Sequence, residues 1–135
     1  MSILFPVFGM VLLTFLVSPF VVAARINSVR TRAVRLEYFE VFRGSEPPDR
    51  VIQTTRHWAN LYEAPVLFYV ACLMAYVVQV NSPWLVGLAW AYVAARMAHS
   101  CIHLTYNRIK HRFRAFAISQ MILLAMWLMI FIYII

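Results

Sequence analysis

The fold is decided by residues 115–135, which read AFAISQMILLAMWLMIFIYII and contain no charged side chain. A helix needs about 20 mostly apolar residues to cross the hydrocarbon core of a bilayer, so this stretch is long enough to span it. Three further apolar runs lie upstream, at residues 3–24, 61–80 and 83–104. The sequence therefore predicts four transmembrane helices, near 3–24, 61–80, 83–104 and 115–135.

The composition agrees with this prediction. Of the 135 residues, 64% are hydrophobic and 13% are charged, whereas a soluble domain is nearer to half apolar and a quarter charged. A cytoplasmic Rossmann or barrel enzyme is therefore excluded, and the continuous apolar runs argue against a membrane β-barrel, whose strands alternate. We expect an all-α integral membrane protein, with residues 1–135 forming a single four-helix domain.

The basic residues are sorted along the chain, and their positions say more than the net charge of +7. Between the third and fourth predicted spans lie Arg108, Lys110, Arg112 and Arg114. Seven arginines lie between the first and second spans, at positions 25, 30, 32, 35, 43, 50 and 56. Because cytoplasmic loops are enriched in Lys and Arg, both loops are predicted to be cytoplasmic and both termini external. We therefore expect no nucleic-acid partner.

Local signals predict where several helices begin and end. Residues 25–42 lack Pro and Gly, which predicts that the first helix continues past the membrane surface. Residues 43–49, RGSEPPD, have the composition of a turn, and Asp49 is the predicted N-cap of the next helix. Ser82 before Pro83 is a second start signal, with a capping residue followed by proline at the first helical position.

The second span begins with a polar stripe. Arg56, Asn60 and Glu63 share one helical face at i, i+4 and i+7. A charge deep in a bilayer costs at least about 2.5 kcal/mol, so this face must meet protein, ligand or water. One interpretation is a binding site, which a kink at Pro65 could open; the other is that Glu63 pairs with a neighbouring arginine and only holds helices together.

The third span carries a second stripe at spacings of three or four residues: Arg96, His99, His103, Asn107 and Lys110. His99 and His103 have metal-ligand spacing, with Glu63 as a possible third ligand. This signal is weak, and we expect no metal. Arginine forks and histidine donors suit a small anionic ligand better. The alternative for residues 108–114 is contact with lipid phosphates, which leaves Arg96 and His99 unexplained.

These motifs resemble a known family. The pattern Arg56-x3-Asn60-x2-Glu63 followed by Pro65, within NLYEAPVLFY, and the segment RMAHSCIHLTYNRIKHRF resemble the MAPEG family, the membrane-associated proteins in eicosanoid and glutathione metabolism, and within it a bacterial branch. The resemblance covers about residues 25–113, and the terminal spans match only in hydropathy. It implies a homotrimer in the bacterial inner membrane, with periplasmic termini and glutathione bound between subunits near the cytoplasmic side.

The resemblance also implies roles for individual residues. Arg56, Asn60 and Glu63 match residues that contact glutathione in the family, and Arg25 matches an arginine at the end of the first span that takes part. His99 and His103 stand where members carry two tyrosines. The arginine that stabilises the glutathione thiolate aligns with Lys110, or with Arg108 or Arg112 after a small shift. We expect Lys110 and Arg112 to be catalytic and the others to bind glutathione.

The function implied is a glutathione-dependent transferase or peroxidase, with glutathione as co-substrate and lipophilic electrophiles that arrive through the membrane lipid. The competing hypothesis is a non-catalytic lipid-binding or scaffold protein of the same architecture, motivated by the loss of the two tyrosines. A third class is a small multidrug-type transporter, which also has four short helices and a membrane glutamate. The seven arginines of the first loop argue against that class.

Overall fold

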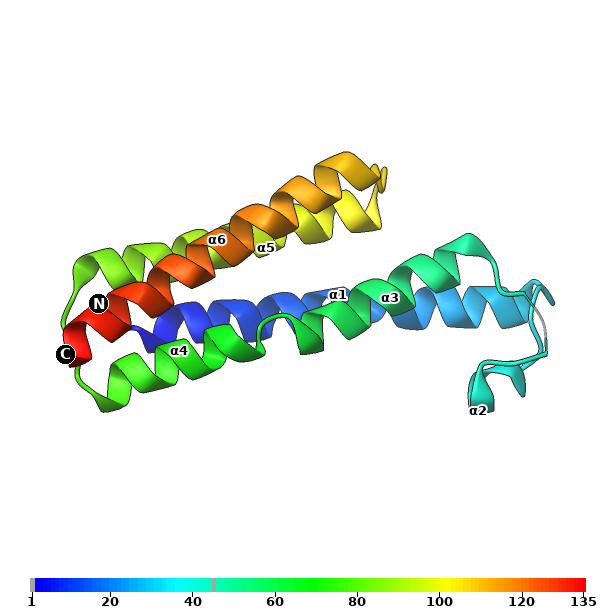
Figure 1. Ribbon diagram of the computed structural model, residues 1–135. Helices are drawn as coiled ribbons and strands as arrows, with labels where there is room; N and C mark the ends of the chain where they lie inside the picture. Colours follow the sequence, from blue (N-terminus) through cyan, green and yellow to red (C-terminus); the bar gives the residue numbers. More distant parts are fainter. Residues whose placement is uncertain (1, 45) are drawn as a thin grey trace.

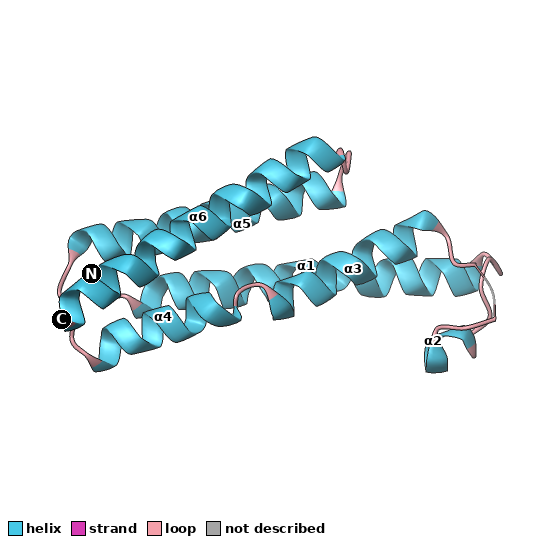
Figure 2. Cartoon of the chain, in the orientation of Figure 1, coloured by secondary structure: helices cyan, strands magenta, loops and turns pink. Residues whose placement is uncertain are grey.

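The computed structural model describes residues 2–44 and 46–135, which fold into helices joined by short loops (Figures 1 and 2). The order is α1 (Leu4–Arg30), α2 (Tyr38–Val41), α3 (Asp49–Glu63), α4 (Val66–Val77), α5 (Pro83–Leu104) and α6 (Ile109–Ile134). Four stretches are long and apolar enough to cross a membrane: α1, α3 with α4, α5 and α6. The predicted all-α, four-span fold is confirmed.

The helices form two groups that meet in the apolar half of the molecule. α5 and α6 make the most extensive helix pair, an antiparallel hairpin, and α1 packs along α3 and α4. Both termini lie at one end, while the α1–α3 connection and the α5–α6 turn lie at the other (Figure 1). At that second end the tip of the α5–α6 hairpin diverges from α3. The two basic segments, residues 25–56 and 108–114, lie at this same end of the bundle.

The core lies toward the end that carries the termini. Phe68 of α4 stacks on Tyr92 of α5, with ring centroids 4.4 Å apart and planes 11° apart. Both side chains are fully buried, with Met10 and Met126 beside them in the same apolar cluster. α1 approaches α5 closely, because a Cβ added at Gly9 would lie only 3.1 Å from the Trp90 ring.

The outward faces are apolar as well. Phe8 of α1, for example, is 68% exposed and Ile132 of α6 is 74% exposed. Contiguous exposed surface of this kind suits lipid tails and not water. The chain is therefore a multi-pass membrane protein.

α1 ends earlier than the sequence predicts. It stops at Arg30 and does not continue to Phe42. Arg32 takes a left-handed conformation, with φ of 57°, and the N–H groups of Ala33 and Val34 donate back to the Ser28 carbonyl. Val34 is only 3% exposed. The chain must turn for Val34 to be buried. The free energy gained by burying Val34 outweighs the helix propensity of residues 31–42.

The other start and stop signals gave mixed results. Ser82 caps α5 by accepting from Leu85 N, with Pro83 at the start of the helix, as predicted. The prediction for Asp49 is wrong, because Pro48 holds the cap position and Asp49 is the first helical residue. There its carboxylate still lies at the positive end of the helix dipole.

Pro65 interrupts the second span, as its missing N–H requires. α3 ends at Glu63 and α4 begins at Val66, and the gap is visible as a loop between them (Figure 2). The hydroxyl of Tyr92 donates to the Ala64 carbonyl at 3.5 Å, which gives the broken turn a partner from α5.

Candidate functional site

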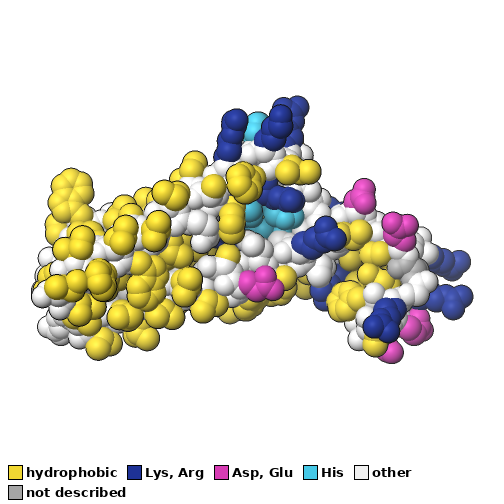
Figure 3. Space-filling view, viewed as in Figure 1, with side chains coloured by type: hydrophobic (Ala, Val, Ile, Leu, Met, Phe, Trp, Pro, Cys, Tyr) yellow, Lys and Arg dark blue, Asp and Glu magenta, His cyan; other side chains and the backbone are white. Residues whose placement is uncertain are grey.

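The polar side chains of the spans gather where the hairpin tip diverges from α3. Figure 3 shows histidine side chains together with Lys or Arg side chains in the notch between the hairpin tip and α3. We call this group the basic cluster; its members are His57, Asn60, Arg96, His99, His103 and Arg112. They come from α3, α5 and α6, so three separate helices build one site.

α3 contributes His57 through its inward face. The buried residues of this helix, Val51, Thr54, His57 and Leu61, recur every three or four positions. The His57 ring lies 4.7 Å from the His103 ring and 5.7 Å from the His99 ring, measured between centroids. The side chain is fully buried, and neither ring nitrogen has a hydrogen-bond partner.

Arg96 is the most deeply placed charge in the cluster. It is fully buried on α5, and its Nη2 donates to Oδ1 of Asn60 at 2.6 Å. The guanidinium carbon also lies 5.9 Å from the centre of the Phe116 ring. Nε and Nη1 have no partner. A buried guanidinium with unused donors can accept an anion into the site.

Arg112 joins the start of α6 to the histidines of α5. Its Nη1 donates to Oδ1 of Asn107 at 2.8 Å and lies 3.4 Å from Nε2 of His103. Nδ1 of His99 donates to the Arg112 backbone carbonyl at 3.1 Å. Since arginine only donates, Nε2 of His103 accepts, and its Nδ1 has no partner.

Side chains of α3 also hold the end of α5. Gln53 Nε2 donates to the His103 carbonyl, and Arg50 Nη1 donates to the Leu104 carbonyl. The last carbonyls of a helix lack partners within the helix and carry its negative dipole end, so a cation there is favourable. These contacts fix the position of His103 relative to α3.

The cluster has positive charge and no buried negative charge to balance it. Within residues 2–44 and 46–135, every acidic side chain is exposed. Burying an ion is costly unless an opposite charge or several hydrogen bonds compensate it. With two arginines, and with N–H donors on His57 and His103 that have no partner, the cluster is chemically suited to a carboxylate or a thiolate.

Of the eight residues predicted to bind glutathione or to act in catalysis, the structure brings four together: Asn60, His99, His103 and Arg112. It places the others elsewhere. Arg56 and Glu63 are exposed on α3, and Lys110 is exposed on α6. Arg25 is half-buried, with its guanidinium 5.6 Å from the rings of both Phe39 and Phe42.

The third-span stripe is shorter than the sequence suggests. α5 ends at Leu104, and Asn107 has a φ of 46° in the turn that follows. Asparagine tolerates this left-handed conformation better than most residues. Lys110 therefore lies on the next helix and does not continue the face of Arg96 and His103.

Sequence reasoning missed His57. It stands next to Arg56, about 100° around the helix from it, and a periodicity count over Val51, Thr54 and Leu61 would have put it on the buried face. Arg96 was predicted to lie in a stripe suited to an anionic ligand, but it was not among the residues predicted to bind glutathione. The described residues contain no group of three or more His, Cys, Asp or Glu arranged to hold a metal ion.

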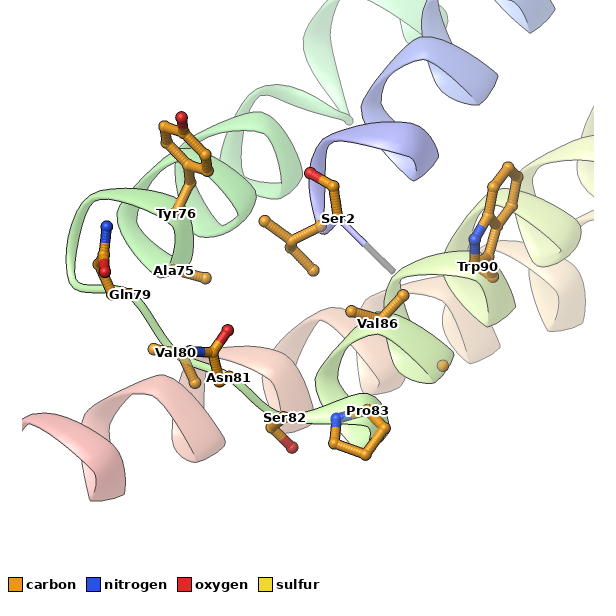
Figure 4. Close-up of a pocket in the computed structure, with 12 residues that line it drawn as sticks. Ser2, Ala75, Tyr76, Gln79, Val80, Asn81, Ser82, Pro83, Val86 and Trp90 are labelled. Atoms are coloured by element: carbon orange, nitrogen blue, oxygen red, sulfur yellow. The ribbon is translucent and has the colours of Figure 1, made fainter.

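A second hollow lies at the opposite end of the bundle, among the start of α1, the end of α4 and the start of α5 (Figure 4). It has a volume of about 850 Å³, and its polar lining residues include Ser2, Gln79, Asn81 and Ser82. None of the described residues that line it is charged. A multiply charged ligand is therefore better matched by the basic cluster.

The fold and the site define a class: a multi-pass, four-span membrane protein with a basic polar site at one end of its bundle. The sequence matches the MAPEG family over residues 3–132, so the chain belongs to that family. It is thus a membrane protein of the family associated with glutathione and eicosanoid metabolism. No curated protein and no solved structure matches the chain.

Proposed function

We propose that the protein is a glutathione-dependent membrane transferase or peroxidase that acts on lipophilic electrophiles. The observation that carries this proposal is Arg96, a fully buried guanidinium with two unpartnered nitrogens beside three histidines. Glutathione supplies two carboxylates and an ionisable thiol, which are the groups that such a site lacks. Family membership supports the same ligand.

The proposal includes a homotrimer. Arg56 and Glu63 are exposed in a stretch that crosses the membrane, and lipid offers no hydrogen bonds to charged side chains. A neighbouring protomer against this face of α3 would satisfy them. Glutathione would then lie between subunits, with Glu63 on its ammonium group, and with Arg56, Arg25 and Asn60 on its carboxylates and amides.

The proposed chemistry depends on a thiolate, because the thiolate is the nucleophile and the thiol is mostly protonated at neutral pH. Arg112 or Lys110 would stabilise it. Lowering the thiol pKa by about two units corresponds to roughly 2.7 kcal/mol of interaction. Arg112 belongs to the basic cluster and lies 3.4 Å from Nε2 of His103, whereas Lys110 is exposed, so Arg112 is the better placed of the two cations.

Two reactions fit this site. In a transferase the sulfur forms a bond to the electrophilic carbon, and the leaving group departs with the electron pair. In a peroxidase two glutathiones are oxidised to their disulfide, while a hydroperoxide is reduced to an alcohol and water. His103 would donate a hydrogen bond from its unpartnered Nδ1 to the oxygen that develops charge, and His99 would donate from Nε2 when its ring is protonated; this is the role we assign in place of the family's tyrosines.

We also propose that residues 1–135 act as one domain in a bacterial inner membrane, with both termini periplasmic. The arrangement in Figure 1 supports this topology, since both termini lie opposite the two basic segments. The basic cluster would then be near the cytoplasm, where glutathione is abundant. Lipophilic substrates would enter from the bilayer.

The competing proposal is a non-catalytic lipid-binding or scaffold protein. The observation that favours it is burial: His57 and Arg96 are fully enclosed, and His103 is only 6% exposed. A ligand reaches them only if the hairpin tip and α3 separate further. This proposal predicts lipid binding without turnover.

The deciding experiment is an activity assay of the purified protein in detergent. Glutathione would be supplied with an activated aryl halide, and separately with a fatty-acid hydroperoxide. The proposal expects a conjugate or a glutathione disulfide, with the rate lost in Arg96→Gln and kept in Arg114→Gln, an exposed arginine at the same end. Bound glutathione with no product in either assay would favour the scaffold proposal.

A further inference from the structure

The segment between α1 and α3 encloses a second basic site, separate from the basic cluster. A hollow of about 540 Å³ lies there, lined by three arginines, Tyr38, Glu37 and neighbouring backbone. We call Arg32, Arg35 and Arg43 the arginine cradle. They are part of the basic first loop, but here the structure collects them around one space.

Local backbone geometry builds this cradle. Arg32 has a φ of 57° in the tight turn after α1, and the turn is fixed by the burial of Val34. At the other side, Phe42 has a φ of 55° and Gly44 a φ of 101°, so the chain reverses around Arg43. The conformation at Gly44 is one that residues with a Cβ avoid.

Aromatic contacts attach the segment to the rest of the protein. The rings of Phe39 and Phe42 lie 5.6 Å from the guanidinium of Arg25, which belongs to α1. Tyr38 packs edge-on against both phenylalanines. The cradle therefore has a defined position just beyond the end of a membrane helix.

The cradle carries free donors and a positive charge. Among residues 2–44 and 46–135, no side-chain hydrogen bond engages Arg32, Arg35 or Arg43, whereas Arg50, Arg96 and Arg112 all have such bonds. Among the lining residues that the structure describes, Glu37 is the one acid beside three arginines, which leaves a net charge of +2. Guanidinium groups bind phosphate oxygens in a fork geometry.

Exposed apolar side chains stand beside these charges. Leu36 is 68% exposed and Val41 is 66% exposed. These apolar side chains would not stabilise a free anion dissolved in water. They would stabilise the acyl chain of a lipid at a bilayer surface, because the contact removes apolar surface from water. We propose that the arginine cradle binds the phosphate of an anionic phospholipid, with Leu36 and Val41 against its acyl chains. This proposal does not depend on glutathione activity.

The test compares two triple variants with the same loss of charge. One is Arg32→Gln/Arg35→Gln/Arg43→Gln in the cradle; the control is Arg30→Gln/Arg108→Gln/Arg114→Gln, exposed arginines at the same end. Binding of phosphatidylglycerol and phosphatidylcholine to the purified protein in detergent would be titrated by native mass spectrometry. Circular dichroism would verify that both variants keep the wild-type helix content.

In the proposed site each cradle guanidinium donates to the lipid phosphate, and each such charge-assisted bond contributes about tenfold in affinity, so the cradle variant should bind phosphatidylglycerol at least about 100-fold more weakly. The control arginines make no such bond, so their variant should change affinity less than about fivefold, the effect of one nearby surface cation, and phosphatidylcholine should bind weakly to all three proteins. Equal losses in both variants would show that attraction is spread over the whole basic end. That result, or unchanged binding in the cradle variant, would overturn the proposal.

A second arm separates a lipid from a free phosphate. Leu36→Ser should weaken phosphatidylglycerol binding, while Ile109→Ser, which removes a similarly exposed side chain at the same end, should not. Glycerol phosphate should compete only at concentrations far above those of the lipid. If it competes as well as the lipid does, the site binds a soluble anion and the lipid assignment is wrong.

Discussion

Nη2 of Arg96 donates a 2.6 Å hydrogen bond to Oδ1 of Asn60. The bond joins α5 to α3 just before the Pro65 break, and it orients a guanidinium whose other nitrogens, Nε and Nη1, have no partner. Asn60 belongs to the motif that pointed to the family, but here it touches another protein side chain. It therefore positions the buried cation, in addition to any contact with a ligand.

Replacing Arg96 by glutamine should weaken glutathione binding by about 10- to 100-fold, the usual effect of removing hydrogen bonds that involve a charged group. The loss should appear in affinity, measured by isothermal titration. Arg114→Gln removes the same charge from an exposed position of α6 and should bind glutathione like the wild type. Equal binding by both variants would remove Arg96 from the site.

Arg56→Ala and Glu63→Gln test the exposed face of α3. If this face anchors glutathione between subunits, each change should raise the KM for glutathione and leave kcat nearly unchanged, because an anchor binds substrate and transition state alike. Arg30→Ala and Glu46→Gln are matched exposed controls. Unchanged KM and affinity in both test variants would make the stripe structural and favour the lipid-binding proposal.

Arg112 and Lys110 should differ as supports for the thiolate. Arg112→Ala should leave glutathione bound but raise the pKa of its thiol and slow conjugation, whereas Lys110→Ala should have little effect, since Lys110 is exposed. Arg112 also contacts Asn107 and His103, so Arg112→Lys serves to separate charge from packing. A titration of the bound thiolate by ultraviolet absorbance would measure the thiol pKa in the Arg112 and Lys110 variants. The reverse order of effects would assign the role to Lys110.

Tyr92 provides a test of the fold near the break in the second span. Tyr92→Phe removes the hydrogen bond to the Ala64 carbonyl and keeps the ring stacked on Phe68; it should cost about 0.5–1.5 kcal/mol. Tyr92→Ala also removes the buried ring and should cost about 3–5 kcal/mol. Denaturant unfolding in mixed micelles would measure the difference. If both variants lose the same free energy of unfolding, the stacked Tyr92 ring contributes nothing to stability.

Topology and assembly can be tested together. Reporter fusions at the C-terminus should report the periplasm, and fusions after Arg43 or Arg108 should report the cytoplasm, because the basic residues cluster in these two segments. Native mass spectrometry in mild detergent should show a trimer. A cytoplasmic C-terminus would contradict the predicted orientation in the membrane, and a persistent monomer would contradict the shared site.

The fold could be predicted because hydrophobicity at the scale of 20 residues is a strong signal. The start of α5 at Ser82 and Pro83 and the break at Pro65 could also be predicted, because each depends on a backbone constraint of the residue itself. The residue at which α1 ends could not be predicted from the sequence. It depends on the burial of Val34, a tertiary contact that outweighs the local preference for helix.

Only some of the residues of the candidate site could be predicted from the sequence, for a similar reason. Spacing placed Arg56, Asn60 and Glu63 on one face, but it could not say that Asn60 would turn to Arg96 while the other two would stay exposed. Periodicity could put His57 on the buried face of α3, but it could not show which residues His57 would meet, because its contacts with His99 and His103 form only after α3 and α5 have packed.

The central claim is that this chain binds glutathione as a thiolate through its buried basic cluster. The most direct measurement is an ultraviolet difference titration of the purified protein with glutathione, compared with S-methylglutathione, which cannot ionise at sulfur. We predict a saturable thiolate absorbance with glutathione, none with the methylated analogue, and its loss in Arg96→Gln. Saturable binding without a thiolate signal, or no binding by the folded wild-type protein, would contradict the claim.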